Sequence, residues 1–433
     1  MARYNKSLSI PDGKPPGKPP GKPPGPAKRD GAPGNSFSDL FLPKDAALRR
    51  KVERQNMSVL PDRAYPLSDI VNGGYFGSNN VVISGGNSAV RFETERLLVE
   101  RALLGFKVPT IIIHSGNPCF LQRYKTPVRL PGNVCGIYSP LASMSPDEAA
   151  TVLTRVGSST LGLPNIMGFW KLVTSLAEMI YGMASLGNIR QFPLYDLQSF
   201  IMEKALPERQ MEFVNLYDRV ADKIDDAQLL LSELAELPLD NPFNQRVFSL
   251  NDVVRGGGMV CIDIVSDSNT LYKELCFAEI ERMMRNGQRF VLVAENIQVL
   301  AKDGSYTDRV LVNNNEGISL VYGAEDVFTA AQSKPEFFQR ITGGSSNTIV
   351  YRHNSSQSAK QWEEYFGQYY HVAADMSVTT SRDTFKFFSQ TNTSGMSTKQ
   401  ELRSIIPERM ILDQNEGCAV VKTAGGELWF SMV

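Results

Sequence analysis

Residues 80–92 read NVVISGGNSAVRF, and this stretch decides how the rest of the chain is interpreted. An apolar run at 80–84 predicts a buried strand, and Gly85-Gly86 ends it with the kind of turn that glycine favours. A helical pattern follows at 92–105, and a second apolar run at 108–114 predicts another strand. Strand, glycine turn, helix and strand together form a βαβ unit, which implies a parallel sheet.

The pattern changes between residues 146 and 237, where helical spacing prevails and strand signals are few. Ser145-Pro146 has the residue types of a helix start, with serine at the N-cap and proline just inside. Strand patterns return further along, with one helix among them, at 259–265, 270–285 (the helix), 289–293 and 317–322. We therefore predict an α/β fold with a mostly parallel sheet and an inserted all-α domain.

The N-terminal segment has a composition of its own. G-K-P-P occurs three times within residues 11–34, and its period of four excludes the collagen repeat. Proline without apolar partners predicts an extended basic arm with polyproline II character. The domain prediction is an arm at 1–40, an α/β nucleotide-binding-type domain at 41–142 and 246–433, and the all-α domain at 143–245.

Charge and composition exclude some classes of protein. The 433 residues carry a net charge of −1 while residues 1–30 carry +5, so the remainder carries −6 and is no general magnet for nucleic acid. The five cysteines are scattered without a CxxC motif, which fits a reducing compartment. No apolar stretch approaches the roughly 20 residues of a membrane span. These features predict a cytoplasmic protein without a direct membrane span.

The turn at Gly85 stands where a phosphate loop, G-x-x-x-x-G-K-[ST], would begin. Counting from Gly85, the second glycine position is Val90, the lysine position is Arg91 and the hydroxyl position is Phe92. An arginine can still meet a phosphate, but a phenylalanine cannot hold Mg²⁺. The candidate nucleotide-binding residues are Gly85, Gly86, Asn87, Ser88 and Arg91.

The strand at 289–293 leads into a second candidate site. An apolar strand that ends in two acids is the Walker B pattern, but here the first acid position is Ala294 and only Glu295 remains. Glu295 is therefore the candidate catalytic base. Because the metal acid and the metal hydroxyl at Phe92 are both missing, the pattern indicates a degenerate Mg²⁺ site, and we predict no metal ligands.

Other chemistries have little support in the sequence. The three histidines, His114, His353 and His371, are far apart, so neither a metal cluster nor a Ser-His-Asp nucleophile is indicated. Asp263 and Asp267 lie near the strand at 259–265. A carboxylate pair is one interpretation of them, and we favour the other, that they cap the strand–helix junction.

From about residue 69 onward, the order of these sites resembles the coupling-protein ATPases of conjugation and type IV secretion. These are the TraG/TraD-type proteins of the FtsK/HerA class. Gly323 stands where that family has a sensor glutamine. The segment 341–350 looks like its next strand, 359–367 looks like its following helix, and 403–421 is similar to its C-terminal motif.

The resemblance implies a RecA-like P-loop NTPase fold with ATP and Mg²⁺ as cofactors. It also implies a hexameric ring, of one chain or of two, and partners among the secretion or conjugation machinery and its adaptors. Members of the family usually carry N-terminal membrane helices, whereas this chain has the basic arm. A location peripheral to the inner membrane would therefore come through partners.

Two main hypotheses follow, with a third beside them. The favoured one is a catalytically degenerate component, a pseudo-ATPase that serves as a scaffold or recruits substrates and adaptors through its helical domain. The alternative is an active ATPase that translocates DNA or protein, with Arg91 in place of lysine and Glu295 as base. The third is a nucleic-acid-binding protein that uses residues 1–34.

Overall fold

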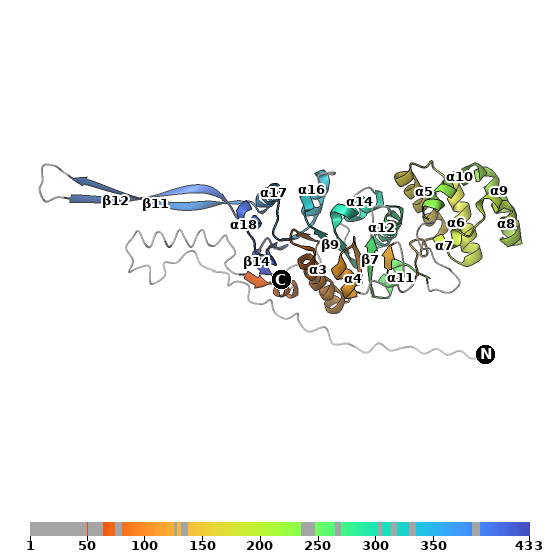
Figure 1. The fold of residues 1–433 in the computed structure, drawn as a ribbon, viewed down its shortest axis with the longest axis horizontal. Coiled ribbons are helices and arrows are strands. Elements are labelled where there is room, and N and C mark those ends of the chain that lie inside the picture. Colours follow the sequence, from red (N-terminus) through yellow and green to blue (C-terminus); the bar gives the residue numbers. More distant parts are fainter. Residues whose placement is uncertain are drawn as a thin grey trace, which may run out of the picture.

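The computed structural model describes residue 50 and most of the chain from residue 64 onward. The described ranges are 64–73, 80–124, 128–130, 137–234, 247–264, 270–301, 305–312, 318–328, 335–382 and 390–433. The predicted arm at 1–40 lies outside them. Figure 1 shows an elongated molecule, with a group of helices at one end, a sheet with its helices in the middle and a two-stranded ribbon at the other end.

A ten-stranded sheet forms the middle of the molecule, in the order β1-β14-β13-β10-β2-β9-β8-β3-β7-β4. Its strands are β1 (Ala64–Pro66), β2 (Val81–Ser84), β3 (Thr110–His114), β4 (Val128–Leu130), β7 (Met259–Ile264), β8 (Phe290–Glu295), β9 (Ile318–Ala324), β10 (Asn347–Val350), β13 (Cys418–Lys422) and β14 (Leu428–Met432). The strands from β10 to β4 are parallel, and β13 and β14 extend the sheet with antiparallel pairs. The predicted α/β fold with a mostly parallel sheet is confirmed.

The central strands are buried on both faces, as expected when helices cover a parallel sheet on each side. Every residue of β2, β3 and β8 is buried. Consecutive residues contribute to different apolar cores, since Val82 belongs to one while Val81 and Ile83 belong to the other. Continuous apolar runs in the sequence therefore predicted these strands to within one or two residues.

Eleven described helical segments accompany the sheet. They are α2 (Leu67–Asn72), α3 (Ser88–Glu100), η2 (Arg101–Gly105), α4 (Pro118–Tyr124), α11 (Leu250–Arg255), α12 (Thr270–Arg285), α13 (Ile297–Leu300), α14 (Ser305–Leu311), α16 (Pro335–Gly344), α17 (Ser356–Phe366) and α18 (Glu408–Leu412). The strand expected at 341–350 is wrong in its first half, because α16 continues through residue 344. In the described part of the chain, no helix is long and apolar enough to cross a membrane.

In the inserted segment, the regular structure of the described residues 139–234 consists of helices joined by turns and short loops. Its elements are α5 (Pro146–Leu161), α6 (Met167–Tyr181), α7 (Leu186–Ile189), η3 (Leu194–Asp196), α8 (Leu197–Lys204), α9 (Pro207–Val220), η4 (Ala221–Lys223) and α10 (Ile224–Glu233). Ser145 starts it with a capping box to Glu148. Short strands β5 (Ile137–Tyr138) and β6 (Val247–Phe248) pair beside the points where the chain enters and leaves the insert.

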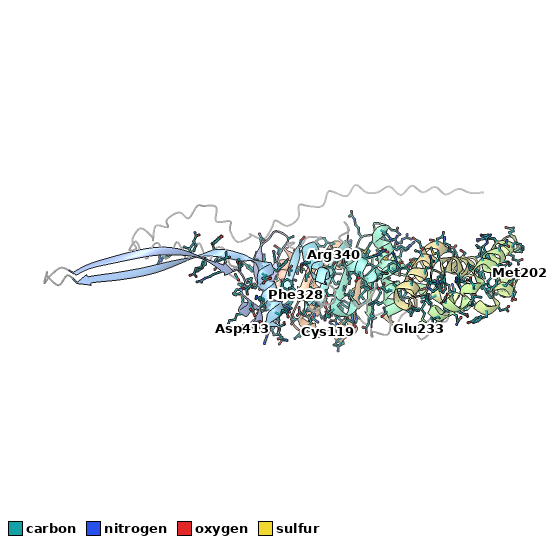
Figure 2. The ribbon with its side chains drawn as sticks, turned by 90° about the horizontal axis from the view of Figure 1, so that it is seen from above. Cys119, Met202, Glu233, Phe328, Arg340 and Asp413 are labelled. Atoms are coloured by element: carbon teal, nitrogen blue, oxygen red, sulfur yellow. The ribbon has the colours of Figure 1, made fainter. Side chains whose placement is uncertain are left out.

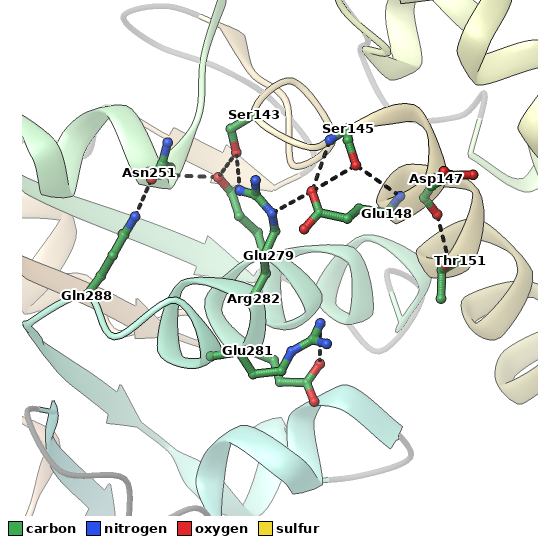
Figure 3. A network of polar contacts seen from close by, with 11 residues as sticks. Ser143, Ser145, Asp147, Glu148, Thr151, Asn251, Glu279, Glu281, Arg282 and Gln288 are labelled. Atoms are coloured by element: carbon green, nitrogen blue, oxygen red, sulfur yellow. Dashed lines mark hydrogen bonds and ion pairs between the residues drawn. The ribbon is translucent and has the colours of Figure 1, made fainter.

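A polar network joins the insert to the sheet domain (Figure 3). Arg282 on α12 donates to Glu148 of α5 over 2.9 Å and to the hydroxyl of Ser143 over 3.4 Å. The same hydroxyl donates to Glu279 of α12 over 3.2 Å, and Tyr138 donates to the other Glu279 oxygen over 2.9 Å. Burial raises the pKa of Glu279 to about 8, although its hydrogen bonds oppose the shift. The junction therefore contains a carboxyl group that is mostly protonated at neutral pH.

The ribbon at the opposite end was not expected. It consists of β11 (Gln368–Arg382) and β12 (Gln390–Ser404), paired antiparallel over the full length of both strands. Figure 1 shows it projecting away from the sheet. At its base, Glu363 of α17 accepts hydrogen bonds from the Ser404 hydroxyl and from the backbone N–H of Glu408. The ribbon is therefore attached to the body at one end.

Candidate nucleotide site

The loop after β2 is folded tightly against the chain that follows β10. Gly85 and Gly86 both have positive φ, at 86° and 68°. The N–H of Gly85 donates to the Ala324 carbonyl over 3.1 Å, and that of Gly86 donates to the Arg352 carbonyl over 2.9 Å. A Cβ on Gly85 would lie 2.8 Å from the carbonyl oxygens of Tyr351 and Arg352. Two N–H groups at the start of the loop are thus bonded within the protein and do not face a phosphate.

Asn87 sets the start of α3, four residues before the predicted helix. Its side-chain oxygen accepts the N–H of Val90 over 2.9 Å, which is an N-cap interaction, so Ser88 becomes the first helical residue. Its side-chain nitrogen donates to Glu416. The amide of Asn87 is therefore engaged on both sides.

Arg91 is buried, with 5% of its surface exposed. Its Nε donates to Glu295 Oε1 over 3.0 Å, and its Nη1 donates to the carbonyl of Gly86 over 2.8 Å. A longer contact of 3.5 Å reaches the Gly85 carbonyl. The residue at the lysine position therefore binds the residue at the base position and the carbonyl groups of its own loop.

A second carboxyl group, Glu95, completes this cluster one helical turn after Arg91. Burial raises the pKa of Glu95 well above its usual range, and the charge of Glu295 together with a hydrogen bond to it raises the pKa further, while Arg91 opposes the shift. The surroundings of Glu95 therefore favour its neutral form, beside the ion pair between Glu295 and Arg91.

Gly323 makes room for the two acids. Strand β9 lies between β2 and β8, and its register places Gly323 beside Glu295. A Cβ at this position would lie 1.9 Å from Glu295 Oε2 and 2.2 Å from Glu95 Oε1. The position of the family's sensor glutamine is thus left without a side chain, and carboxyl groups occupy the space. We refer to Arg91, Glu95 and Glu295 as the buried ionic cluster.

Polar groups at the ends of the neighbouring strands adjoin the buried ionic cluster. Asn117 Nδ2 lies 3.5 Å from Glu295 Oε1, and the backbone N–H of Asn117 donates to His114 Nδ1 over 3.2 Å. His114 Nδ1 also lies 3.4 Å from Asp263 Oδ1, which accepts the N–H of Gly116 over 2.8 Å. The sequence predicts that the histidines are isolated and that Asp263 caps a strand–helix junction. In the structure, Asp263 instead accepts a hydrogen bond from the loop after β3, and its carboxylate contacts His114. Asp267 lies outside the described residues.

The two positions that would hold Mg²⁺ belong to the apolar interior. Phe92 packs edge-on against Phe120, with ring centroids 4.9 Å apart. Ala294 is 1% exposed within β8. Neither offers an oxygen ligand, and among the described residues no group of three His, Cys, Asp or Glu side chains is placed to hold a metal ion.

A cleft of ≈ 690 Å³ lies beside the loop, and Gly86 and Asn87 contribute to its wall. Carboxylates outnumber cationic groups in its lining, where Glu325, Asp326 and Glu416 face Arg352. His353 also lines it and lies 3.2 Å from the Ser84 hydroxyl, and burial lowers the pKa of this imidazole. The cleft is therefore electronegative at neutral pH, which disfavours a triphosphate.

The structure thus brings the six predicted site residues around one turn and one strand end. Gly86 and Asn87 reach the cleft, whereas Arg91 and Glu295 lie buried and bonded to each other. Sequence reasoning missed Glu95. The available signal was its spacing, since Glu95 lies four residues after Arg91 and residues at i and i+4 share a helix face.

No protein-family model and no curated protein sequence matches the chain. Solved structures similar to it include conjugative coupling protein TrwBΔN70 in complex with sulphate, at 13% identity and a TM-score of 0.48, covering 89% of this chain and 91% of that one. TrwB in complex with an ATP analogue has 12% sequence identity and a TM-score of 0.49, and the match covers 88% of this chain and 91% of that one. VirB4 of Thermoanaerobacter pseudethanolicus has 12% sequence identity and a TM-score of 0.44, and the match covers 82% of this chain and 89% of that one. TrwB is a coupling protein, the kind of protein that the sequence motifs resemble.

Proposed function

We propose that this chain is a coupling-protein-like component of a conjugation or type IV secretion machine whose nucleotide centre is closed by its own side chains. The observation that carries the proposal is the ion pair between Arg91 and Glu295. These residues hold the lysine and base positions of a P-loop ATPase, and here they bind each other. The chain then acts as a scaffold or recruiter, in a ring of its own kind or with an active relative.

Opening this centre would be energetically expensive. For a phosphate to reach Arg91, the guanidinium must leave Glu295 and the loop carbonyl groups. Separating one partner from a buried ion pair costs roughly 3–5 kcal/mol, which is about half of the roughly 8 kcal/mol that supports micromolar binding. The electronegative cleft and the apolar residues at positions 92 and 294 offer nothing that compensates for this loss.

The alternative is an active ATPase, and one observation favours it. Gly86 and Asn87 line a cleft of ≈ 690 Å³ next to the loop, so there is space beside the expected phosphate position. The similar protein TrwB has a structure in complex with ADP and Mg²⁺. In this alternative, Arg91 turns toward the phosphates and releases Glu295, which then activates water.

The helical insert supplies the surface for recruitment in this proposal. Three apolar side chains near the α8–α9 turn are exposed, namely Met202, Leu206 and Met211, at 51%, 56% and 64%. Gln210 of α9 donates to the Met202 carbonyl over 2.9 Å, which holds the two helices together there. Met202 lies at the end of the molecule opposite the ribbon (Figure 2). Methionine-rich surfaces adapt to different apolar partners, as a recruiter of several adaptors requires.

The test compares ATP turnover and Mg-ATP binding in the full chain and two variants. We expect no Mg²⁺-dependent phosphate release and no binding heat in calorimetry with up to millimolar Mg-ATP. Glu295→Gln should leave this result unchanged. Turnover that disappears in Glu295→Gln but persists in Glu325→Gln, a control in the cleft wall, would replace the proposal with the active-ATPase alternative.

A further inference from the structure

The ribbon has two faces of different composition. Because β11 and β12 pair in strict register from Gln368↔Ser404 to Arg382↔Gln390, alternate positions of both strands share a face. Of the sixteen positions on the even-numbered face, seven are apolar and the other nine are polar; the apolar ones are Tyr370, Val372, Ala374, Met376, Val378, Met396 and Leu402. The odd-numbered face contains the charged positions Asp375, Lys399, Glu401 and Arg403. On the even-numbered face, the single charged position is Arg382, at the tip.

The base of the ribbon confirms this division where its side chains are described. Tyr370 and Leu402 oppose each other on the even-numbered face and are 71% and 57% exposed. On the other face, polar side chains contact one another, since Arg403 donates to Glu401 over 3.1 Å and the Tyr369 hydroxyl lies 3.4 Å from His371 Nδ1. The apolar face is thus open to solvent where it begins.

A ribbon of two strands is a marginal structure in water without a covering layer. Fifteen paired residues correspond to a length of about 50 Å at ~3.4 Å per residue, and two strands give a width of about 10 Å. One face therefore measures on the order of 500 Å². Two such faces in contact bury on the order of 1,000 Å², which reaches the size of a specific protein–protein interface.

We propose that the even-numbered face of the ribbon packs against the same face of a second copy of this chain. The distribution of charge selects this occupant. Arg382 is the single charged position of this face, so two copies of the face repel each other only where their tips meet. A charged partner would find no complementary charge along the rest of the face. Packing in opposite directions places each Arg382 position near the uncharged base around Tyr370, so the two tips stay apart. The interface is then two-fold symmetric.

This inference does not depend on the state of the nucleotide centre. The ionic cluster lies in the sheet domain, whereas the ribbon is joined to the body at its base only. A ribbon that fails to associate leaves the proposed function standing, and an active ATPase leaves the ribbon proposal standing.

The first experiment measures the mass of the full chain by sedimentation equilibrium over a range of concentrations. We expect a concentration-dependent dimer for the wild type. Met376→Lys places a charge at the centre of the proposed interface in both copies and should raise the dissociation constant at least about 100-fold. Ser377→Lys places the same charge one residue further on the opposite face and should leave the dissociation constant within about threefold.

Mixing variants identifies the occupant. Met376→Lys and Met376→Glu should each lose the ribbon-mediated dimer when alone, and an equimolar mixture should recover it, because opposite charges then meet across the interface. Amide hydrogen exchange of residues 369–381 serves as a check that the ribbon stays paired in each variant. A wild-type chain that is monomeric at all concentrations, equal effects of Met376→Lys and Ser377→Lys, or no recovery in the mixture would each overturn the proposal.

Discussion

Gly323 is the residue on which the packing of the buried ionic cluster depends. Two carboxyl groups, Glu95 and Glu295, approach its α-carbon from α3 and β8, and no larger residue leaves room for both. A larger side chain at this position, such as glutamine, would occupy the space of the buried ionic cluster. Arg91 and Gly323 are therefore linked through Glu295, because Arg91 pairs with this acid and the acid needs the space that the glycine leaves.

We expect Gly323→Ala to destabilise the protein by about 1–3 kcal/mol or more, because the added methyl group overlaps both carboxyl oxygens in a packed interior. Urea unfolding at pH 7 measures the change. Gly343→Ala is the matched control, since a Cβ there meets nothing within 4 Å. Equal effects of the two substitutions would mean that the acids move aside at no cost.

The sequence identified the positions of this site but not its connections. The phosphate-loop turn, Arg91 and Glu295 follow from local pattern, because each stands at a fixed distance from a strand or helix end. The ion pair joins residues 204 positions apart, and it depends on the order of strands in the sheet. From the sequence, Gly323 is interpreted as a glycine in place of a sensor glutamine. Only the packing shows that the carboxyl groups of Glu95 and Glu295 occupy the space of that side chain.

At the scale of elements, α12 is the helix that joins the two parts of the molecule. Its ends agree with the prediction, Thr270–Arg285, because the helical period and its length are both clear in the sequence. At the junction, its residue Glu279 accepts hydrogen bonds from Ser143 and from the backbone N–H of Asn251 (Figure 3). Tyr138 donates a further hydrogen bond to Glu279. A buried acid in this setting makes the stability of the junction depend on pH.

We expect the free energy of unfolding to fall as the pH rises from about 4.5 to about 8, because Glu279 holds its proton up to about pH 8 in the folded chain and has an ordinary value of 4.5 when exposed. The folded state binds the additional proton in this range, so the stabilisation is complete below pH 4.5 and lost above pH 8. Its size is on the order of a few kcal/mol.

Glu279→Gln should remove this part of the pH dependence, since the amide stays neutral and can accept from Asn251 and Ser143 while donating to Tyr138. Urea unfolding at several pH values between 5 and 8.5 gives the slope. Glu178→Gln, at an exposed position of α6, should keep the wild-type slope. An unchanged slope in Glu279→Gln would show that other groups cause the dependence.

The ribbon marks the limit of prediction at this scale. Its strands alternate between apolar and polar residues with the period of two that is expected of a half-buried strand. Small and hydroxyl-bearing residues weaken this alternation. Each strand also pairs with one partner only. No neighbouring element in the sequence signals the pairing. The central strands were recognisable because burial on both faces demands a continuous apolar run.

The whole molecule places a mostly parallel sheet between two ends that expose apolar side chains. The insert presents its exposed methionines at one end, and the ribbon projects from the other (Figure 1). An apolar core is continuous from the sheet into the insert, since Val82 and Trp170 belong to the same cluster. The scaffold role that we propose would benefit from this continuity, because the two ends would then keep a fixed separation.

The distribution of charge over the whole chain leads to the last prediction, which concerns nucleic acid. Residues 1–30 carry +5 and the remaining residues −6, so attraction to phosphates belongs to the arm and the rest of the molecule repels them. We expect weak binding of a single-stranded oligonucleotide at 50 mM salt, lost at 200 mM salt and absent after deletion of residues 1–34. Fluorescence anisotropy of a labelled oligonucleotide measures it. Replacing Lys14, Lys18 and Lys22 by glutamine keeps the length of the arm and should reduce the affinity about as the deletion does. Binding that survives the deletion would instead assign the contact to the folded body, against the sign of its net charge.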